Sequence, residues 1–283
     1  MRLTRFVVVG AALTGCTFGA PDGVVIDAPP DVSVDAPPDV DTGGRVIDDH
    51  LIALWRFNEG TGTLVGDTAR TFRPWYTKPP MDLVIESATG SQWIGTDGLQ
   101  IDGNVTIRSR PGMGARPHMT PDVNGSGAVT LELWVTPADI VQGSPTPATL
   151  FSLGSGPSNC SVRITQTGSQ YIGCAKTVAT ARGTEKTIPT PTGSAAAAVQ
   201  HVVLVADGTT RAVYVDGVPY AAPAADVAPM AGWIENFRIS IADEAMGGGP
   251  WRGRFWFAAV YDRVLTPEEI RQNLAAGHLC SSC

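Results

Sequence analysis

The sequence has few charged and aromatic side chains and no long hydrophobic run. Charged residues make up 17% of the 283 positions and aromatic residues 7%, whereas there are 32 glycines and 22 prolines. Such a composition favours short strands joined by turns over helices. We therefore expect an all-β protein, and a sandwich of this size can form a single domain.

A basic segment of the kind that binds nucleic acid is also missing. The net charge is −7, of which Arg2, Arg5 and the six aspartates of residues 17–44 account for −4, so residues 45–283 carry −3. A mildly acidic domain without a basic stripe has no electrostatic footprint for nucleic acid. We therefore expect no nucleic-acid partner.

No motif of a known catalytic site is present. The chain contains no H-E-x-x-H, P-loop or G-x-S-x-G segment. Its four histidines are scattered, at positions 50, 118, 201 and 278, and Glu132 is the isolated carboxylate of an apolar segment. Adjacent carboxylates, as in Asp243-Glu244, would point to opposite faces of a strand. We therefore expect that the chain is not an enzyme.

The first sixteen residues have the pattern of a bacterial lipoprotein signal peptide. Arg2 and Arg5 precede an apolar segment, Phe6–Leu13, that is too short to span a bilayer. Leu13-Thr14-Gly15-Cys16 resembles the lipobox, whose cysteine becomes the first residue of the mature protein and is acylated, for example with palmitate. Thr17 favours sorting to the outer membrane by the same resemblance. The alternative is an ordinary secretory signal that ends in a chance cysteine.

Residues 17–46 have the composition of a disordered tether. The sequence Asp-Ala-Pro-Pro-Asp-Val occurs at 27–32 and again at 35–40. Paired prolines and charges of one sign cannot build a core and keep a chain extended. We expect this segment to hold a domain at residues 47–283 away from the membrane surface.

The domain itself is marked by strand patterns. Val202–Val205 is an apolar run closed by Asp207-Gly208, and the following segment, Arg211–Tyr220, alternates around a second tight turn at Asp216-Gly217. These segments predict a meander of three antiparallel strands. In Val129–Val135 the odd positions are apolar, which predicts another strand with one face toward the core. The Pro- and Gly-rich segment 110–127 is expected to be a loop.

Four segments resemble the laminin-G-like family of concanavalin-A-like jelly-roll domains. They are LIALWRFNEGTGT at 51–63, VTLELWV at 129–135, HVVLVADGTTRAVYVDGVPY at 201–220 and VYDRVLTPEEI at 260–270. They occur in the family's order over about residues 47–278. The resemblance implies an antiparallel two-sheet jelly-roll sandwich with one short C-terminal helix.

The resemblance also implies functions and a metal site. Relatives commonly bind calcium, and Asn58, Glu59 and Asp67 match the opening acidic segment, so they are the candidate ligands of one structural calcium ion. The paired-carboxylate pattern of related glucanases, E-x-D-x-x-E, has no match here. We therefore expect a non-catalytic domain that recognises a glycan or a protein of the envelope or the exterior. The alternatives are a structural envelope component and a glycan hydrolase with an unrecognised site.

A candidate ligand site lies in the segment that departs most from this family. Trp75 and Tyr76 follow Arg73 in place of the family's Gly- and Asn-rich turn. Planar aromatic rings beside polar groups can stack on sugars or anchor a protein partner. The other interpretation is that both rings cover an edge of the core.

The remaining cysteines suggest disulfides, as expected in an exported protein. Cys160 and Cys174 lie at equal distances from Thr167 in a predicted hairpin, so they could pair across the strands. Cys280 and Cys283 form a terminal C-x-x-C, for which a small-loop disulfide and pairing with the other two cysteines are both open.

One helix is expected near the C-terminus. Thr266, Pro267 and Glu269 form a capping box with proline in the first turn, and Gly277 ends the segment. Ile270 and Leu274 lie four positions apart and should pack the helix on the sandwich.

Overall fold

The valine-rich meander is the centre of one of two antiparallel sheets. The computed structural model describes residues 44–46, 50–72, 77–87, 89–109, 118–154, 160–177, 186–222, 227–233 and 237–278. They belong to one compact unit, Asp41–Cys283. The predicted strands of the meander are β12 (Gln200–Ala206), β13 (Arg211–Val215) and β14 (Val218–Ala221), paired in that order. The meander prediction is confirmed.

Sheet A contains this meander and five further strands. Its order is β14-β13-β12-β7-β16-β5-β4, and β1 also pairs with β16. The additional strands are β1 (Leu51–Trp55), β4 (Ser91–Trp93), β5 (Leu99–Ile101), β7 (Val129–Pro137) and β16 (Gly253–Tyr261).

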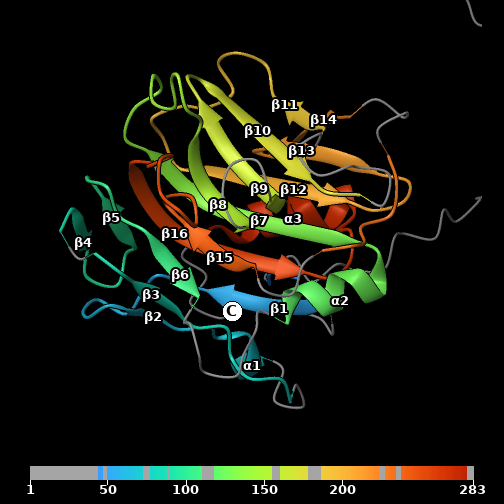
Figure 1. Ribbon diagram of the computed structural model, residues 1–283, viewed down its shortest axis with the longest axis horizontal. Coiled ribbons are helices and arrows are strands. Elements are labelled where there is room, and N and C mark those ends of the chain that lie inside the picture. Colours follow the sequence, from blue (N-terminus) through green and yellow to red (C-terminus); the bar gives the residue numbers. More distant parts are fainter. Residues whose placement is uncertain are drawn as a thin grey trace, which may run out of the picture. The chain divides into compact units, whose positions relative to one another are not determined.

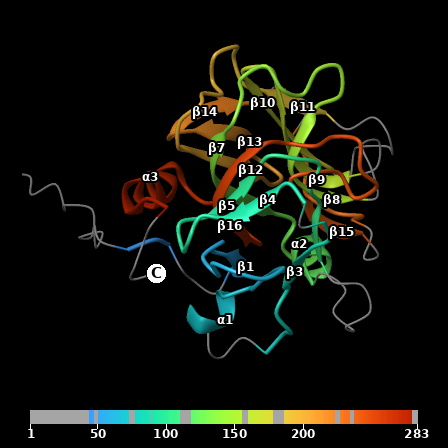
Figure 2. The same ribbon diagram turned by 90° about the vertical axis from the view of Figure 1, so that its left-hand side faces the viewer.

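Sheet B has eight strands in the order β11-β10-β9-β8-β15-β6-β3-β2. They are β2 (Leu64–Val65), β3 (Leu83–Ile85), β6 (Ile107–Ser109), β8 (Ala148–Gly154), β9 (Cys160–Thr167), β10 (Gln170–Ala175), β11 (Thr187–Pro189) and β15 (Arg238–Ile241). In Figure 1 the strands β8 and β9 of this sheet overlap β7 and β12 of sheet A, and Figure 2 shows the two sheets beside each other as stacked layers. The expected two-sheet jelly-roll sandwich is confirmed.

The alternation of β7 sorts its side chains between two apolar clusters. Val129, Leu131, Leu133 and Val135 lie in the core between the sheets, as predicted. Trp134 belongs to a second cluster on the other side of sheet A. Both faces of β7 are therefore covered, and Figure 2 shows the element that covers the outer one, α3, beyond the strands of sheet A.

Helix α3 (Pro267–Ala276) confirms the predicted C-terminal helix and its caps. The Thr266 hydroxyl accepts a hydrogen bond from the Glu269 amide, and the Glu269 carboxylate accepts one from the Thr266 amide. Ile270 is fully buried in the outer cluster of sheet A, and Leu274 packs against that cluster. Burial of this apolar face fixes the helix on sheet A.

Two further helices are α1 (Ala69–Phe72) and α2 (Met119–Ser126). The second corrects the expectation of a loop at 110–127. Met119 and Val123 are buried in the core, and Gly127 ends the helix in the left-handed conformation with its amide bonded to the Val123 carbonyl. Burial of these two side chains outweighs the low helix propensity of the segment.

The predicted hairpin of the two cysteines exists, but its register differs from the expected one. Thr167 pairs with Gln170, so the turn is centred one to two residues later than Thr167. As a result Cys174 lies opposite Arg163, while Cys160 pairs with Gly154 on β8. The geometric argument for a cross-strand disulfide is therefore wrong, and a bond between these cysteines stays an untested prediction.

Gly173 allows a close contact between the sheets, and its replacement tests the packing. A Cβ atom there would lie 2.4 Å from Cγ2 of Val213 and 3.0 Å from Cδ1 of Leu204. We predict that Gly173→Ala lowers the free energy of unfolding by about 1–3 kcal/mol, because the core must shift to admit a methyl group. Chemical denaturation of the parent and the variant measures this difference in the free energy of unfolding.

Gly125→Ala is the matched control for this substitution. Gly125 lies in α2, and a Cβ atom there would meet nothing within 4 Å. Alanine is the better helix former by roughly 0.5–1 kcal/mol, so this variant should be as stable as the parent or slightly more stable. Equal effects of the two substitutions would refute the proposed packing of the sheets.

Candidate functional site

A β-bulge in β16 gives the outer face of sheet A an additional aromatic side chain. Phe255 pairs with Val135 and Phe257 with Trp134, so Trp256 is the extra residue. Phe255 lies in the core between the sheets, whereas Phe257 and Trp256 both belong to the outer cluster. Bulges commonly redirect a side chain near functional sites.

Three neighbours hold the Trp256 ring in place. Its indole Nε1 donates a hydrogen bond of 2.9 Å to the Thr136 hydroxyl. The guanidinium carbon of Arg254 lies 4.8 Å from the ring centroid, and the His278 ring lies at 4.3 Å and 61°. The indole is half-buried, so part of it remains accessible.

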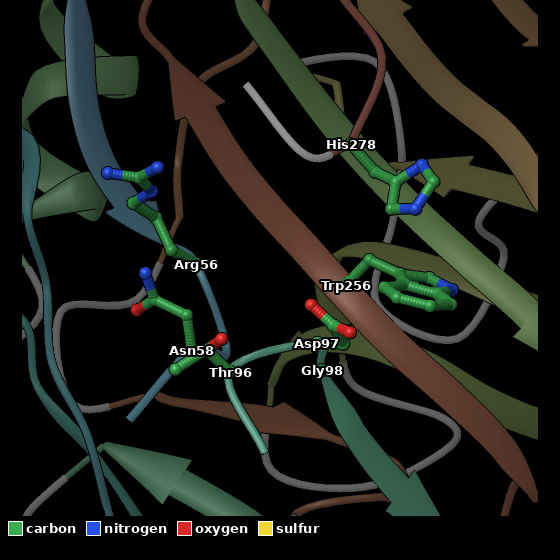
Figure 3. Close-up of a pocket in the computed structure, with 7 residues that line it drawn as sticks. All are labelled: Arg56, Asn58, Thr96, Asp97, Gly98, Trp256 and His278. Carbon is green, nitrogen blue, oxygen red and sulfur yellow. The ribbon is translucent and has the colours of Figure 1, made fainter. Parts of the chain in front are cut away.

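Trp256 forms one wall of a pocket of ≈ 240 Å³, which we call the Trp256 pocket. Figure 3 shows its lining, in which the Asp97 carboxylate lies beside the indole. The lining residues come from β16, from the segment after β1, from the β4–β5 turn and from the end of α3; they are Arg56, Asn58, Thr96, Asp97, Gly98, Trp256 and His278.

Backbone geometry brings two of these segments to the pocket. Gly98 has a φ of 102°, and a Cβ atom there would lie 2.6 Å from the Phe255 carbonyl oxygen, so only glycine lets the β4–β5 turn come this close to β16. Phe57, between Arg56 and Asn58, has a φ of 47°, which is rare for a bulky side chain. Its ring stacks on Phe255 at 5.5 Å, and this packing holds the strained backbone.

A buried ion network lies beside the pocket, under α3. Glu132 is fully buried and forms an ion pair with Arg45. Its carboxylate also lies 2.9 Å from His201 Nε2 and accepts a hydrogen bond of 2.8 Å from the Asn273 amide. Burial opposes ionisation, but the Arg45 charge and the His201 hydrogen bond outweigh it and lower the pKa of Glu132 to about 2.

Aromatic contacts join this network to the pocket. The Trp134 ring stacks on His201 at 4.8 Å and lies 5.5 Å from His278. Burial lowers the pKa of His278, and the Arg45 charge adds to this against the opposing effect of Asp97. The net effect lowers the pKa of His278, whose ring packs against both indoles.

The network corrects the expected boundary between tether and domain at residue 46. The Arg45 side chain is 1% exposed and its guanidinium carbon lies 3.9 Å from the Phe257 ring centroid. Val46 packs against the outer cluster of sheet A. The folded unit therefore includes residues that the composition assigned to the tether, because the charge of Glu132 needs Arg45.

The three predicted calcium ligands make other contacts in the structure, and a calcium site at these residues stays a prediction. Asn58 is exposed at the Trp256 pocket, and Glu59 accepts a hydrogen bond from the Gly66 amide. Asp67 accepts hydrogen bonds from the amides of Leu54, Ala69 and Met81. Within the described ranges no group of three or more His, Cys, Asp or Glu side chains could hold a metal ion.

Several other predicted sites lie outside the described residues, so they stay predictions. They are the signal peptide with Cys16, the tether to residue 43, the loop residues Arg73, Trp75 and Tyr76, and the terminal cysteines Cys280 and Cys283.

The sequence interpretation missed most of the Trp256 pocket and all of the ion network. One signal for the pocket was available, because Phe255-Trp256-Phe257 puts three aromatic residues in succession where a strand should alternate. Asn58 was singled out for a different role, and Glu132 was described as isolated. Its partners lie 69 to 141 residues away in the chain, so no local pattern reveals them.

Solved structures with the same fold include sialidases and a toxin domain. A Trypanosoma rangeli sialidase in complex with 2,3-difluorosialic acid, described as a covalent intermediate, matches 85% of this chain with a TM-score of 0.60 at 20% identity. The binding domain of botulinum neurotoxin DC in complex with rat synaptotagmin II matches 81% with a TM-score of 0.55 at 12% identity. This chain covers 35% of the sialidase and 52% of the toxin domain. No curated protein matches the sequence.

The sialidases contradict the expectation that the chain is not an enzyme. A fold that matches most of this chain occurs within glycan-processing enzymes, so the lack of a known catalytic motif does not rule out catalysis. At 20% identity and about a third of the sialidase's length, the similarity itself establishes the fold alone.

The pKa of Glu132 predicts an acid-dependent loss of stability. Its pKa is lowered from 4.5 to about 2 by folding, so its contribution is complete above pH 4.5 and is lost as the pH falls toward 2. The loss amounts to about 3 kcal/mol. Glu132→Gln should lack this part of the pH dependence and be less stable at pH 7 by roughly 3–5 kcal/mol, because Arg45 then has no countercharge. Urea unfolding of the parent and the variant between pH 7 and pH 2 measures the pH dependence and the difference in stability at pH 7.

Glu268→Gln serves as the control for this change. Glu268 pairs with Arg271 on the exposed side of α3, where ion pairs contribute little. The free energy of unfolding of Glu268→Gln should depend on pH as that of the parent protein does. If the free energy of unfolding of Glu132→Gln fell with pH below 4.5 as steeply as that of the parent, the Glu132 carboxylate would not be held ionised by the fold.

The family of the chain follows from its sequence together with this fold. The model of the concanavalin A-like lectin/glucanases superfamily, Laminin_G_3, matches residues 113–271, which is more than half of the chain. The matched part contains β7, the meander, the bulged strand β16 and the start of α3. Two antiparallel sheets with one short C-terminal helix agree with the resemblance found in the sequence. This chain belongs to the concanavalin A-like lectin/glucanases superfamily.

Proposed function

We propose that this protein recognises a carbohydrate in the Trp256 pocket. The bulge in β16 carries the proposal, because it places a partly exposed indole on the outer face of sheet A beside Asp97 and Asn58. The strained backbone at Phe57 supports it, since such strain often marks a functional segment.

The lining has the chemistry that sugar binding requires. An indole offers a flat apolar surface to the C–H face of a sugar ring. The Asp97 carboxylate accepts hydrogen bonds from hydroxyl groups, while the Asn58 amide both donates and accepts them. A few polar groups around an aromatic surface fix the orientation of a small ligand.

The size of the pocket favours a glycan over a protein ligand. Its volume of ≈ 240 Å³ lies just below the range of about 300–1,000 Å³ typical of sites for drug-sized ligands. A single sugar unit at the end of a longer glycan fits this description. Two T. rangeli sialidase neighbours are complexes with sialic acid or its difluoro derivative, so sialylated glycans belong among the ligands to be tested.

We also propose that the chain is attached to the bacterial cell envelope through lipid on Cys16, in the outer membrane. The lipobox resemblance and the acidic, proline-rich segment after it support this location. None of the helices in the described ranges is long and apolar enough to cross a membrane. A lipid-held domain would present the Trp256 pocket to envelope or extracellular glycans.

Trp256→Ala should weaken glycan binding, because it removes the flat wall of the pocket. An array of sialylated and neutral oligosaccharides probed with the full chain identifies bound glycans, and titration calorimetry then measures the affinity of each. We expect a loss of at least about 10-fold, or 1.4 kcal/mol. Mass spectrometry of the incubated oligosaccharides shows in addition whether they are shortened, as a hydrolase would do.

Two variants complete this test. Trp75→Ala changes the other candidate aromatic site and should leave binding unchanged, as should Met246→Ala, whose side chain is 80% exposed away from the pocket lining. Binding lost in Trp75→Ala and kept in Trp256→Ala would move the site to the aromatic loop. No bound oligosaccharide on the array would refute the proposed function.

Cys16→Ser should abolish lipid attachment, because the acyl chain is added to this thiol. Cells that express the full chain and are fed radioactive palmitate should label the parent protein and not the variant. The conservative change Thr17→Ser should leave the label in place. Equal labelling of parent and Cys16→Ser would refute the anchor.

A further inference from the structure

Residues 44–46 are attached along α3 by consecutive hydrogen bonds. The Gly44 carbonyl accepts one from the Gln272 side chain, and the Val46 amide donates one to Asn273. Between them, the Arg45 guanidinium donates through Nη1 to Glu132 and through Nη2 to the Gly277 carbonyl, the latter over 2.5 Å. One side chain therefore joins β7 to the end of α3.

The hydrogen bond from Arg45 to the Gly277 carbonyl lies one residue before His278 of the pocket lining. Gly277 ends α3 with a φ of 72°, and His278 follows it. A hydrogen bond to the Gly277 carbonyl fixes the peptide plane that joins the two residues, since a peptide unit is rigid. The position of the His278 side chain in the pocket wall thus depends on Arg45, which itself does not line the pocket.

His278 in turn sets the accessible surface of the indole. Its ring contacts Trp256 edge to face at 4.3 Å and also contacts Trp134. If the histidine moves, the pocket loses one wall and Trp256 loses one of the neighbours that hold it. Binding sites lose affinity when the supporting contacts of their side chains loosen.

We propose that Arg45 is a positioning residue of the Trp256 pocket, which it shapes by holding Gly277 and, through it, His278. The inference rests on the proposed function, because it assigns Arg45 a role in the affinity of that same pocket. It also makes ligand binding depend on the segment that joins the domain to the residues before it.

Arg45→Lys separates positioning from folding. The guanidinium uses a different nitrogen for each partner, whereas lysine has a single ammonium nitrogen and cannot reproduce the planar fork. Lysine retains the positive charge that Glu132 requires, so the variant should stay folded with a thermal midpoint close to that of the parent. The hydrogen bond to Gly277 should be lost.

The first measurement needs no ligand. In proton NMR spectra of the full chain, the ring protons of His278 should be displaced by the ring currents of Trp134 and Trp256, and His278→Gln assigns them among the four histidines. In Arg45→Lys these signals should move most of the way to the positions of an exposed histidine. The second measurement is the affinity for the array oligosaccharide with the strongest signal, which should fall about tenfold.

Arg263→Lys is the matched control. Arg263 binds Glu269 with two nitrogens, at 2.6 and 2.8 Å, near the other end of α3. The same substitution there perturbs the helix without touching Gly277, so the His278 signals and the affinity should equal those of the parent. Equal changes in both variants would reduce Arg45 to a general support of α3 and overturn the proposal.

The two measurements also distinguish this inference from the proposed function. Unchanged His278 signals in Arg45→Lys overturn the inference whatever the array shows. Displaced signals with unchanged affinity overturn it as well, because the position of His278 would then not matter for binding. If the parent protein binds no oligosaccharide, the proposed function fails, and the spectra alone decide whether Arg45 holds His278.

Discussion

The buried charge of Glu132 is the constraint on which the outer face of sheet A depends. A carboxylate without solvent contact costs several kcal/mol unless charges and hydrogen bonds compensate it. Its partners, Arg45, His201 and Asn273, come from the segment before β1, from β12 and from α3. Apolar contacts hold α3 on the sheet, and this network adds a directional hydrogen bond from Asn273 of the helix to Glu132. The buried charge therefore ties Arg45 and the last helix to sheet A.

Local patterns predicted the parts of the fold that local interactions determine. The meander of β12–β14 follows from β-branched runs and tight turns, and the capping box of α3 involves residues three apart. The hairpin of β9 and β10 shows the limit of this reasoning. Its existence was predictable, but the placement of Cys174 required the register, and a shift of one residue moves a side chain to the other face. Turn geometry, which the sequence indicated only approximately, decides that register.

The candidate site was less predictable because distant segments build it. The Trp256 pocket combines residues near positions 57, 97, 256 and 278, and no spacing in the sequence connects them. Its most informative feature, the bulge, exists only in relation to the partner strand β7. Asn58 was found through the family resemblance as a metal ligand, yet in the structure it lines the pocket. The resemblance thus singled out a segment that lines the pocket, and a calcium site there stays a prediction.

The charges around the Trp256 pocket bear on the selectivity of the proposed binding site. The lining contains one guanidinium, that of Arg56, and one carboxylate, that of Asp97, and burial lowers the pKa of His278. The balanced lining gives little long-range attraction for a charged ligand, so short-range packing and hydrogen bonds must distinguish one ligand from another. Such contacts discriminate only when the groups that make them are held still. The contacts that surround Trp256, with Thr136, Arg254 and His278, are therefore part of the proposed site as well as of the fold.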